Sequence, residues 1–240
     1  MIIVSKKNIQ FQKLKKLTLK KYRELYQEFL IFGEHLIEEA LRKGIILKLY
    51  TISSDKEGIL ISKDLMKELN LNKIVYSRCA ICKKISKPLK SDKILVLDGV
   101  QDPGNVGTLL RSACSFGFHH IFGSFQTADF YNEKTIQSSQ GSLFYLFLER
   151  GDVDTFLSLY KKNNYFILGT SVDKKKIDLK KISLSLQNYK KILVLGNEGS
   201  GISDLLEKKI DYFLHIETSI VESLNVSAAG SILMYLLSNQ

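Results

Sequence analysis

The sequence predicts an α/β protein with a mainly parallel sheet, helices on both faces of that sheet, and a smaller α/β unit before it. Short apolar runs at residues 93–97 and 191–195 are typical of buried parallel strands. Such runs alternate with amphipathic helical segments, which is the pattern of strand–helix–strand units. A polar, basic stretch with a central proline, residues 83–93, precedes them. We therefore expect two units, residues 1–85 and 92–240.

Composition limits the class of protein. The chain has 240 residues, of which 45% are hydrophobic and 25% charged, so it can form a sizeable core. The net charge of +10 favours a polyanionic partner, although part of this excess follows from a Lys-rich composition throughout. No apolar run approaches the roughly 18 residues of a membrane span. No secretory signal is visible, and three cysteines form no disulfide framework. We expect a cytoplasmic protein without a membrane partner.

The first unit begins with the most basic part of the chain. The first 50 residues hold eleven basic and five acidic side chains. Residues 12–23 predict one amphipathic helix, with Leu14, Leu17 and Tyr22 on its apolar side. Its basic face is a candidate RNA-binding surface, and the alternative is an ordinary solvated helix face. The candidate residues are Lys13, Lys15, Lys16 and Lys20.

The rest of the first unit predicts a strand over 28–33, a helix over 34–42 stopped by Gly44, and a second strand over 45–51. Residues 60–75 repeat a helix followed by a strand. The second unit predicts alternating elements. Its expected strands are 93–97, 120–122, 143–148, 165–169, 191–195 and 212–216, and its expected helices are 106–116, 132–139, 154–161, 202–208 and 225–237.

Three segments of the second unit share one design, in which a polar turn rich in Gly, Asn, Ser and acidic residues precedes a helix. They are residues 97–113, 195–202 and 221–229. Ligands of parallel sheets bind at the carboxyl ends of the strands, so the three turns would converge on one site. A single turn of this kind closes many strand–helix units without any ligand, whereas three in order are far more specific.

Residues 92–240 resemble the SpoU (TrmH-like) family of RNA ribose 2′-O-methyltransferases in the SPOUT superfamily. The resemblance rests on DPGNVGTLLRSA, LGNEGSGIS and VESLNVSAA, with SQGSLF between the first two. The N-terminal FLIFGEHLIEEAL resembles, more loosely, the small ribosomal-protein-like substrate-binding domain often attached to this family. The resemblance implies methylation of a ribose 2′-hydroxyl in tRNA or rRNA with S-adenosylmethionine, a C-terminal trefoil knot, a homodimer and structured RNA as partner.

The resemblance also implies the site residues. Arginine cannot accept a proton readily, so we assign Arg111 to clamping a phosphate and orienting the hydroxyl. Around the third turn the family often has Ile-Pro-Met, whereas this chain has HIETSIV. His215 is therefore an alternative to Ile216 as the residue that contacts the cofactor. The implied catalytic residues are Asn105, Arg111, Glu198, Ser223 and Asn225. The implied cofactor-binding residues are Thr170, Leu195, Gly196, Gly199, Ile216 and Leu224.

Two rival functions stay open: a knotted-fold methyltransferase acting on an RNA base, and a non-catalytic RNA-binding protein. Other chemistry is poorly supported. Cys79 and Cys82 form a single CxxC pair without a second pair or a histidine cluster, so we expect inert cysteines and no metal. Cys114 is expected to pack on its helix, and His119 and His120 lack ligand spacing. The Lys-rich stretch 173–181 either faces RNA or serves solubility.

Overall fold

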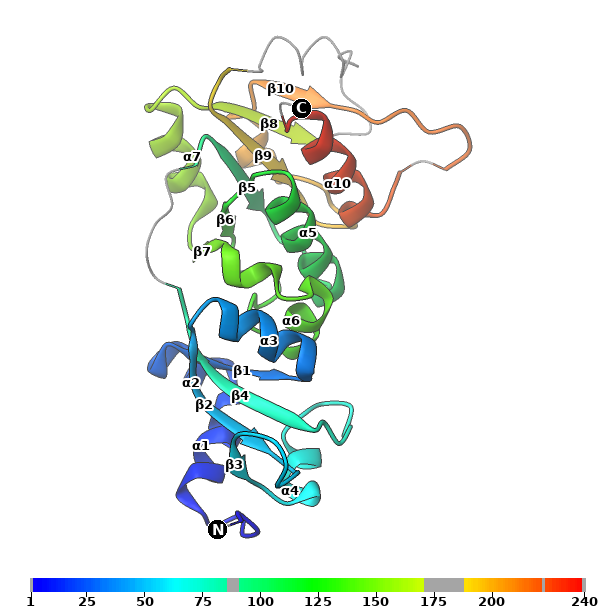
Figure 1. Cartoon of the computed structure of the whole chain (residues 1–240). Coiled ribbons are helices and arrows are strands. Elements are labelled where there is room, and N and C mark those ends of the chain that lie inside the picture. The colour runs from blue at the N-terminus through cyan, green and yellow to red at the C-terminus, as the bar shows by residue number, and fades with distance from the viewer. Residues whose placement is uncertain (1, 86–90, 171–187, 222, 239–240) are drawn as a thin grey trace.

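The computed structural model describes residues 2–85, 91–170, 188–221 and 223–238. The chain forms two sheets, one of four strands and one of six, in two units stacked end to end (Figure 1). The N-terminus lies at the far end of the first unit, and the C-terminus lies in the second. The predicted Lys-rich stretch 173–181 falls outside the described residues.

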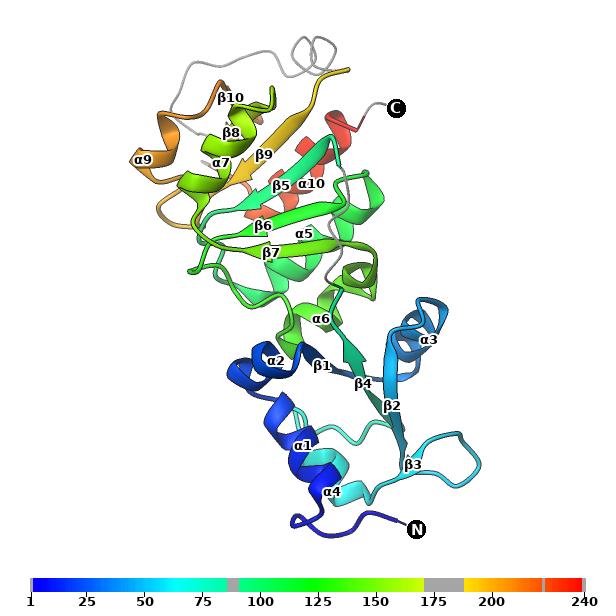
Figure 2. The same ribbon diagram turned by 90° about the vertical axis from the view of Figure 1, so that its left-hand side faces the viewer.

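The first sheet has the strand order β1-β4-β2-β3. β4 pairs antiparallel with both β1 and β2, and β2 pairs parallel with β3. Helices α1 and α4 cover one face and share a buried core with it, and α3 lies on the other face (Figure 2). The bounds are α1 Ile9–Leu17, α2 Lys20–Tyr26, β1 Glu28–Phe32, α3 Glu34–Arg42, β2 Ile46–Thr51, β3 Ile59–Leu60, α4 Lys63–Glu68 and β4 Arg78–Lys83.

Two expectations for this unit were wrong. The single helix predicted over residues 12–23 is broken after Leu17, because the Thr18 hydroxyl donates back to the Lys15 carbonyl and Leu19 is extended. The strand expected before residue 75 begins only at Arg78. The intervening chain is held as a loop by Asn70, whose amide nitrogen lies 2.7 Å from the Ile74 carbonyl oxygen and whose amide oxygen accepts from the Ile74 N–H at 2.9 Å.

The second sheet is parallel throughout, with the order β10-β8-β9-β5-β6-β7. This confirms the predicted α/β class with a parallel sheet. Its strands are β5 Lys93–Leu97, β6 His120–Gly123, β7 Phe147–Arg150, β8 Phe166–Thr170, β9 Lys191–Leu195 and β10 Tyr212–Leu214. The apolar run expected as a strand over 143–148 instead forms a short 3-10 helix, η1 Ser142–Tyr145, and β7 follows it. A short apolar run alone does not distinguish the two structures.

Helices cover both faces of the second sheet, as predicted (Figure 1). α5 and α10 pack on one face, and α7 and α9 share a core with the other. Their bounds are α5 Pro103–Ser115, α6 Glu133–Ser139, α7 Val153–Lys161, α9 Asp204–Glu207 and α10 Val226–Leu236. The strand order reverses between β5 and β9, so the turns after these two strands lie side by side at one edge. The trefoil knot stays a prediction.

The cysteines of the CxxC pair lie on β4 and are fully buried on opposite sides of the first sheet. Burial raises the pKa of the Cys79 thiol to about 12 and also raises that of Cys82, so both are neutral at pH 7. They act as small apolar side chains in the two cores. Cys114 is half-buried on α5.

Candidate functional site

The turn after β5 leads directly into α5. Asp102 caps this helix by accepting a hydrogen bond from the Asn105 N–H at 2.9 Å, and Pro103 occupies the first helical position. Lys134 of α6 lies 2.7 Å from the other Asp102 oxygen and, through this hydrogen bond, lowers the pKa of Asp102. The cap and the ion pair fix the first turn of α5, on which Asn105 is carried.

The turn after β9 is closed by Asn197, a residue that the sequence analysis did not single out. Its amide oxygen accepts from the N–H groups of Gly199 and Ser200, at 2.9 and 3.1 Å. Its amide nitrogen donates to the Gly99 carbonyl at 2.8 Å and so joins this turn to the one after β5. An Asn two residues before a Gly is a sequence signal of such a turn.

Gly196 is required by its own turn. A Cβ atom added at this position would lie 2.2 Å from the backbone carbon of Gly201, so no side chain fits. The resemblance implies that Gly196 binds the cofactor. The structure shows a more direct reason for a glycine at this position, which is that the chain turns back on itself between Asn197 and Gly201.

Asn105, Glu198 and Asn225 form one hydrogen-bonded chain. The amide nitrogen of Asn225 lies 3.1 Å from the amide oxygen of Asn105, and the amide nitrogen of Asn105 lies 3.1 Å from Glu198 Oε1. The Asn225 oxygen caps α10 by accepting from the Ser227 N–H, which leaves its nitrogen to donate. The cap at one end and the carboxylate at the other therefore determine which way the Asn105 amide points.

Glu198 also accepts from the backbone N–H groups of Gln101 and Asp102, at 3.2 and 3.4 Å. Burial would raise the pKa of Glu198, but the hydrogen bonds from Asn105 and from these backbone groups bring it below its ordinary value. The carboxylate is therefore ionised at neutral pH. It ties the second polar turn to the first.

A cavity of about 480 Å³ lies at the carboxyl ends of β8, β9 and β10, a size typical of small-molecule sites. Five of the six predicted cofactor residues line it: Thr170, Gly196, Gly199, Ile216 and Leu224. His215 lines it too, so both alternatives at the third turn face the same space. Leu195 is not among the lining residues because it is buried between β9 and α10, in contact distance of Gly230. Further lining residues are Asn197, Ser200, Ile202, Val226 and Leu233.

The other two predicted catalytic residues are Ser223 and Arg111, and they lie in different places. Ser223 and Glu198 both line the cavity. Arg111 is exposed on α5, six residues after Asn105, and its guanidinium forms no hydrogen bond or ion pair with any residue that the structure describes. A single copy of the chain thus brings Asn105, Glu198 and Asn225 together and leaves Arg111 outside their network.

The four predicted RNA-binding lysines lie on or beside α1. Lys20 and Lys16 are exposed, and the Lys16 ammonium lies 5.6 Å from the centre of the Tyr22 ring. Lys13 pairs with Glu28 at 2.7 Å, and Lys15 donates to the Glu68 carbonyl. This face is therefore partly engaged within the protein.

Within the described ranges, no three His, Cys, Asp or Glu side chains gather as metal ligands. None of the helices described is both long enough and apolar enough to cross a membrane.

Comparison with known proteins identifies the two parts of the chain. Residues 92–235 match the SpoU rRNA Methylase family, and residues 8–95 match the MRM3-like substrate binding domain. The chain is 35% identical, over 97% of both proteins, to the 23S rRNA (guanosine(2553)-2′-O)-methyltransferase RlmP of Bacillus subtilis. It is 27% identical, over 86% of this chain and 82% of the other, to the 23S rRNA (guanosine-2′-O-)-methyltransferase RlmB of Coxiella burnetii.

Among solved structures, the SpoU methyltransferase AviRb of Streptomyces viridochromogenes, in complex with S-adenosylmethionine (AdoMet), has the same fold. It superposes with a TM-score of 0.81 over 97% of each chain, at 24% identity. The match over residues 92–235 covers the parallel sheet, all three polar turns and all but the last residue of α10. The chain belongs to the SpoU rRNA methylase family.

Proposed function

We propose that this protein transfers a methyl group from S-adenosylmethionine to a ribose 2′-hydroxyl of ribosomal RNA. The observation that carries the proposal is the Asn105–Glu198–Asn225 network beside a small-molecule cavity. Family membership supports the reaction type, and the similarity to RlmP over nearly the whole chain supports rRNA over tRNA as substrate. A ribosomal substrate also agrees with the cytoplasmic location that the sequence favours.

The cavity fits S-adenosylmethionine in its chemistry. Leu224, Val226 and Leu233 offer apolar surface for an adenine ring, while the turn at Gly199 and Ser200 offers polar groups. When bound, the cofactor supplies an electrophilic methyl group on a sulfonium. The turn after β9 holds the cavity wall in place through Asn197.

On the ribose side, alignment of the hydroxyl with the methyl donor supplies most of the rate gain. We assign this alignment to the Asn105 amide, which its two neighbours orient. Glu198 is ionised and already accepts three N–H groups, so it suits the holding of Asn105 better than the acceptance of a proton. Arg111 suits a phosphate of the RNA through bidentate hydrogen bonds. Ser223, at the cavity, is the remaining polar group of the site.

Residues 1–85 would hold structured RNA, and residues 92–240 would carry out the transfer. The match of residues 8–95 to a substrate binding domain supports this division. The lysines of α1 and α2 would contact phosphates, a contact that carries no sequence information by itself.

A homodimer, the oligomeric state that the family resemblance implies, agrees with the surface of α10. Ile232 and Tyr235 are 40% and 52% exposed there, and Tyr235 packs edge-on against Phe116 beside α5. The exposed Arg111 lies on the same α5. In a dimer through this face, Arg111 would complete the site of a second copy.

Mass spectrometry of rRNA nucleosides from cells with and without the protein tests the proposal. We expect one 2′-O-methylated nucleoside to be lost without the protein and restored when purified enzyme and S-adenosylmethionine are added to the extracted RNA. A methylated base with an unmodified ribose would favour the base methyltransferase. No heat of binding with millimolar S-adenosylmethionine would favour the non-catalytic RNA-binding protein.

A further inference from the structure

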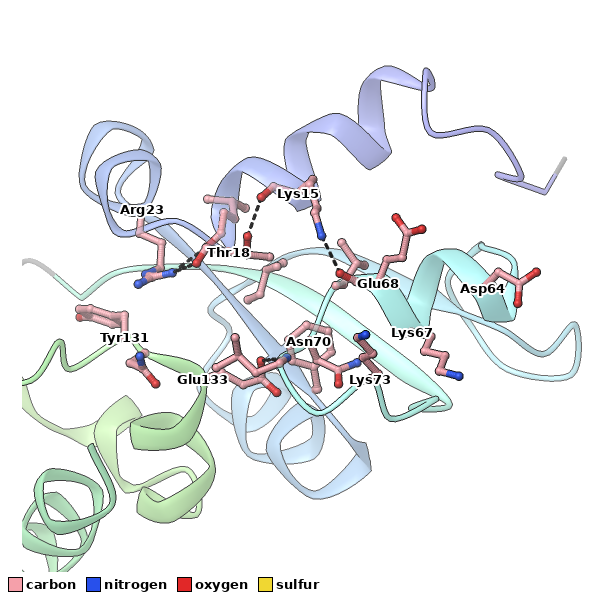
Figure 3. Close-up of a pocket in the computed structure, with 16 residues that line it drawn as sticks. Lys15, Thr18, Arg23, Asp64, Lys67, Glu68, Asn70, Lys73, Tyr131 and Glu133 are labelled. Carbon is pink, nitrogen blue, oxygen red and sulfur yellow. Dashed lines mark hydrogen bonds between the residues drawn. The ribbon is translucent and has the colours of Figure 1, made fainter. Parts of the chain in front are cut away.

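A second cavity, of about 710 Å³, lies where the two units meet. Its walls come from the end of α1, from α4 and the loop after it, and from the start of α6 (Figure 3). Figure 3 shows Lys15 and Glu68 on one side of it and Tyr131 and Glu133 on the other. None of its lining residues lines the cavity at the ends of β8, β9 and β10.

Glu133 is the unusual group in this cavity. The side chain is half-buried, and burial raises its pKa, although a hydrogen bond from the Leu71 N–H opposes that effect. In the described part of the chain, the Leu71 N–H, 2.9 Å from Oε2, is the one group that donates a hydrogen bond to Glu133. Glu133 forms no ion pair with any of these residues. A carboxylate can accept about four hydrogen bonds, so Glu133 retains capacity for N–H donors in the cavity.

The remaining walls combine apolar, cationic and acidic surface, the last from Asp64 and from Glu68, which pairs with Lys6. Leu17, Leu30 and Phe32 form an apolar floor, and the Tyr131 ring lies beside it. Lys67 and Lys73 are exposed at the rim and pair with no acidic residue that the structure describes. Unpaired nucleotides are recognised where the base stacks on aromatic side chains, here Phe32 or Tyr131, its edge is hydrogen-bonded, and its phosphate meets a cation.

The start of α6 links the cavity to the proposed reaction site. Lys134 follows Glu133 in α6 and pairs with Asp102, 2.7 Å away. Asp102 is the residue that caps α5 and holds Asn105. An RNA strand with its ribose at Asn105 would therefore pass Lys134, and the preceding residue, Glu133, lines the cavity.

We propose that this cavity takes an unpaired nucleotide of the RNA substrate near the methylated one, with Glu133 accepting hydrogen bonds from the N–H groups of its base. Lys67 and Lys73 face its phosphate. The inference rests on the proposed RNA methylation and adds a second point of contact to it. The ligand class is a nucleobase with N–H donors on its edge.

The first experiment compares Glu133→Gln with the wild type in methylation of rRNA extracted from cells that lack the protein. We expect KM for the RNA to rise about tenfold, because a charge-assisted hydrogen bond is lost, while kcat and the affinity for S-adenosylmethionine stay unchanged. Glu57→Gln, at an exposed carboxylate outside the cavity, is the control and should change nothing. An unchanged KM in Glu133→Gln would overturn the proposal.

The second experiment leaves Glu133 intact. A benzophenone amino acid replaces Leu71, 74% exposed at the rim, or Leu159, 57% exposed on α7 outside both cavities. With the same rRNA, we expect the Leu71 position to cross-link one nucleotide close in sequence to the methylated ribose. Cross-linking no stronger than that from Leu159, or spread over the RNA, counts against the cavity. If wild-type enzyme methylates no ribose at all, the proposed function fails instead.

Discussion

The side-chain nitrogen of Asn105 lies 3.1 Å from a carboxylate oxygen of Glu198, so that the helix after β5 is tied to the turn after the neighbouring strand β9. The contact spans 93 positions of the sequence. Because Asn225 donates to the same Asn105 from the start of α10, three separate turns meet at one amide. The chemistry proposed for the site depends on this amide keeping its direction.

Asn105→Asp tests that dependence with almost no change in shape. The new carboxylate would face Glu198 at hydrogen-bond distance, where two negative charges repel and the pKa of one of them rises. We expect turnover at pH 8 to fall by at least tenfold, with the affinity for S-adenosylmethionine nearly unchanged. Initial rates of methyl transfer, together with calorimetry of cofactor binding, measure the two quantities.

The pH profile separates this mechanism from simple damage. In the wild type the hydrogen bonds bring the pKa of Glu198 below its ordinary value, so the carboxylate stays ionised to a lower pH than that of a free glutamate. In Asn105→Asp the pair can share one proton as pH falls, which restores a donor between the two side chains. The variant should therefore regain rate, relative to wild type, towards lower pH. A constant ratio of rates across pH would contradict this explanation.

Much of this arrangement was predictable from sequence, because the information is local. The alternation of apolar runs with amphipathic helices gives the parallel sheet, and its carboxyl ends bring the polar turns together. The break after Leu17 and the loop at Asn70 depend on side chains that bind backbone carbonyls, for which hydrophobic spacing gives no signal. The cavity at the junction depends on contacts between Glu133 and a loop 62 positions away.

Gly196→Ala and Gly199→Ala form a matched pair. An added methyl group at Gly196 would meet the backbone of Gly201 at 2.2 Å, whereas at Gly199 the nearest atom is 3.6 Å away, an ordinary contact. We expect Gly196→Ala to displace the turn and to weaken S-adenosylmethionine binding by at least tenfold, while Gly199→Ala, which leaves the turn in place and adds one methyl group at the cavity wall, weakens it less. Calorimetry measures both. Equal affinities in the two variants would mean that the turn does not shape the cofactor site.

Arg111→Ala should keep the affinity for S-adenosylmethionine and lose most turnover, because Arg111 stands apart from the cavity and its guanidinium is exposed. If the site is completed across a dimer, mixing Arg111→Ala with Asn225→Ala should restore up to about a quarter of wild-type activity, since half of the random dimers would hold one intact site. A mixture as inactive as its components, in a preparation shown to exchange subunits, would place Arg111 in the site of its own chain.

Replacing Lys13, Lys15, Lys16 and Lys20 by glutamine should weaken RNA binding and flatten its salt dependence, because fewer counterions are released from the phosphates. Lys13 already pairs with Glu28, so the slope of log affinity against log salt concentration should change by less than the loss of four phosphate contacts would produce. Fluorescence anisotropy with labelled rRNA over a series of KCl concentrations measures the slope. An unchanged slope would return this face to the solvated-helix interpretation.

Arg23 joins the two units through a buried ion pair. Its guanidinium lies 2.6 Å from Asp129, with the two side chains 8% and 11% exposed. The same group donates to the carbonyls of Leu17 and Thr18, at 3.0 and 2.7 Å, and so completes the end of α1. Burial would raise the pKa of Asp129, but Arg23 holds it below its ordinary value. The pair therefore stabilises the fold at pH values above the ordinary pKa of an aspartate. This contribution is lost as pH falls through the depressed pKa of Asp129.

Arg23→Ala should reduce the free energy of unfolding by about 3–5 kcal/mol at pH 7, because it leaves Asp129 buried without its ion-pair partner and frees the last carbonyls of α1. The difference from wild type should shrink as pH falls towards 4, since Asp129 without Arg23 loses the main group that lowers its pKa and takes up a proton at a higher pH than in the wild type. The double variant Arg23→Met, Asp129→Leu should be more stable than Arg23→Ala at pH 7, as it removes the unpaired charge. Urea unfolding at a series of pH values measures all three proteins. A loss of stability that is independent of pH would assign the effect to packing around α1 instead of to the ion pair.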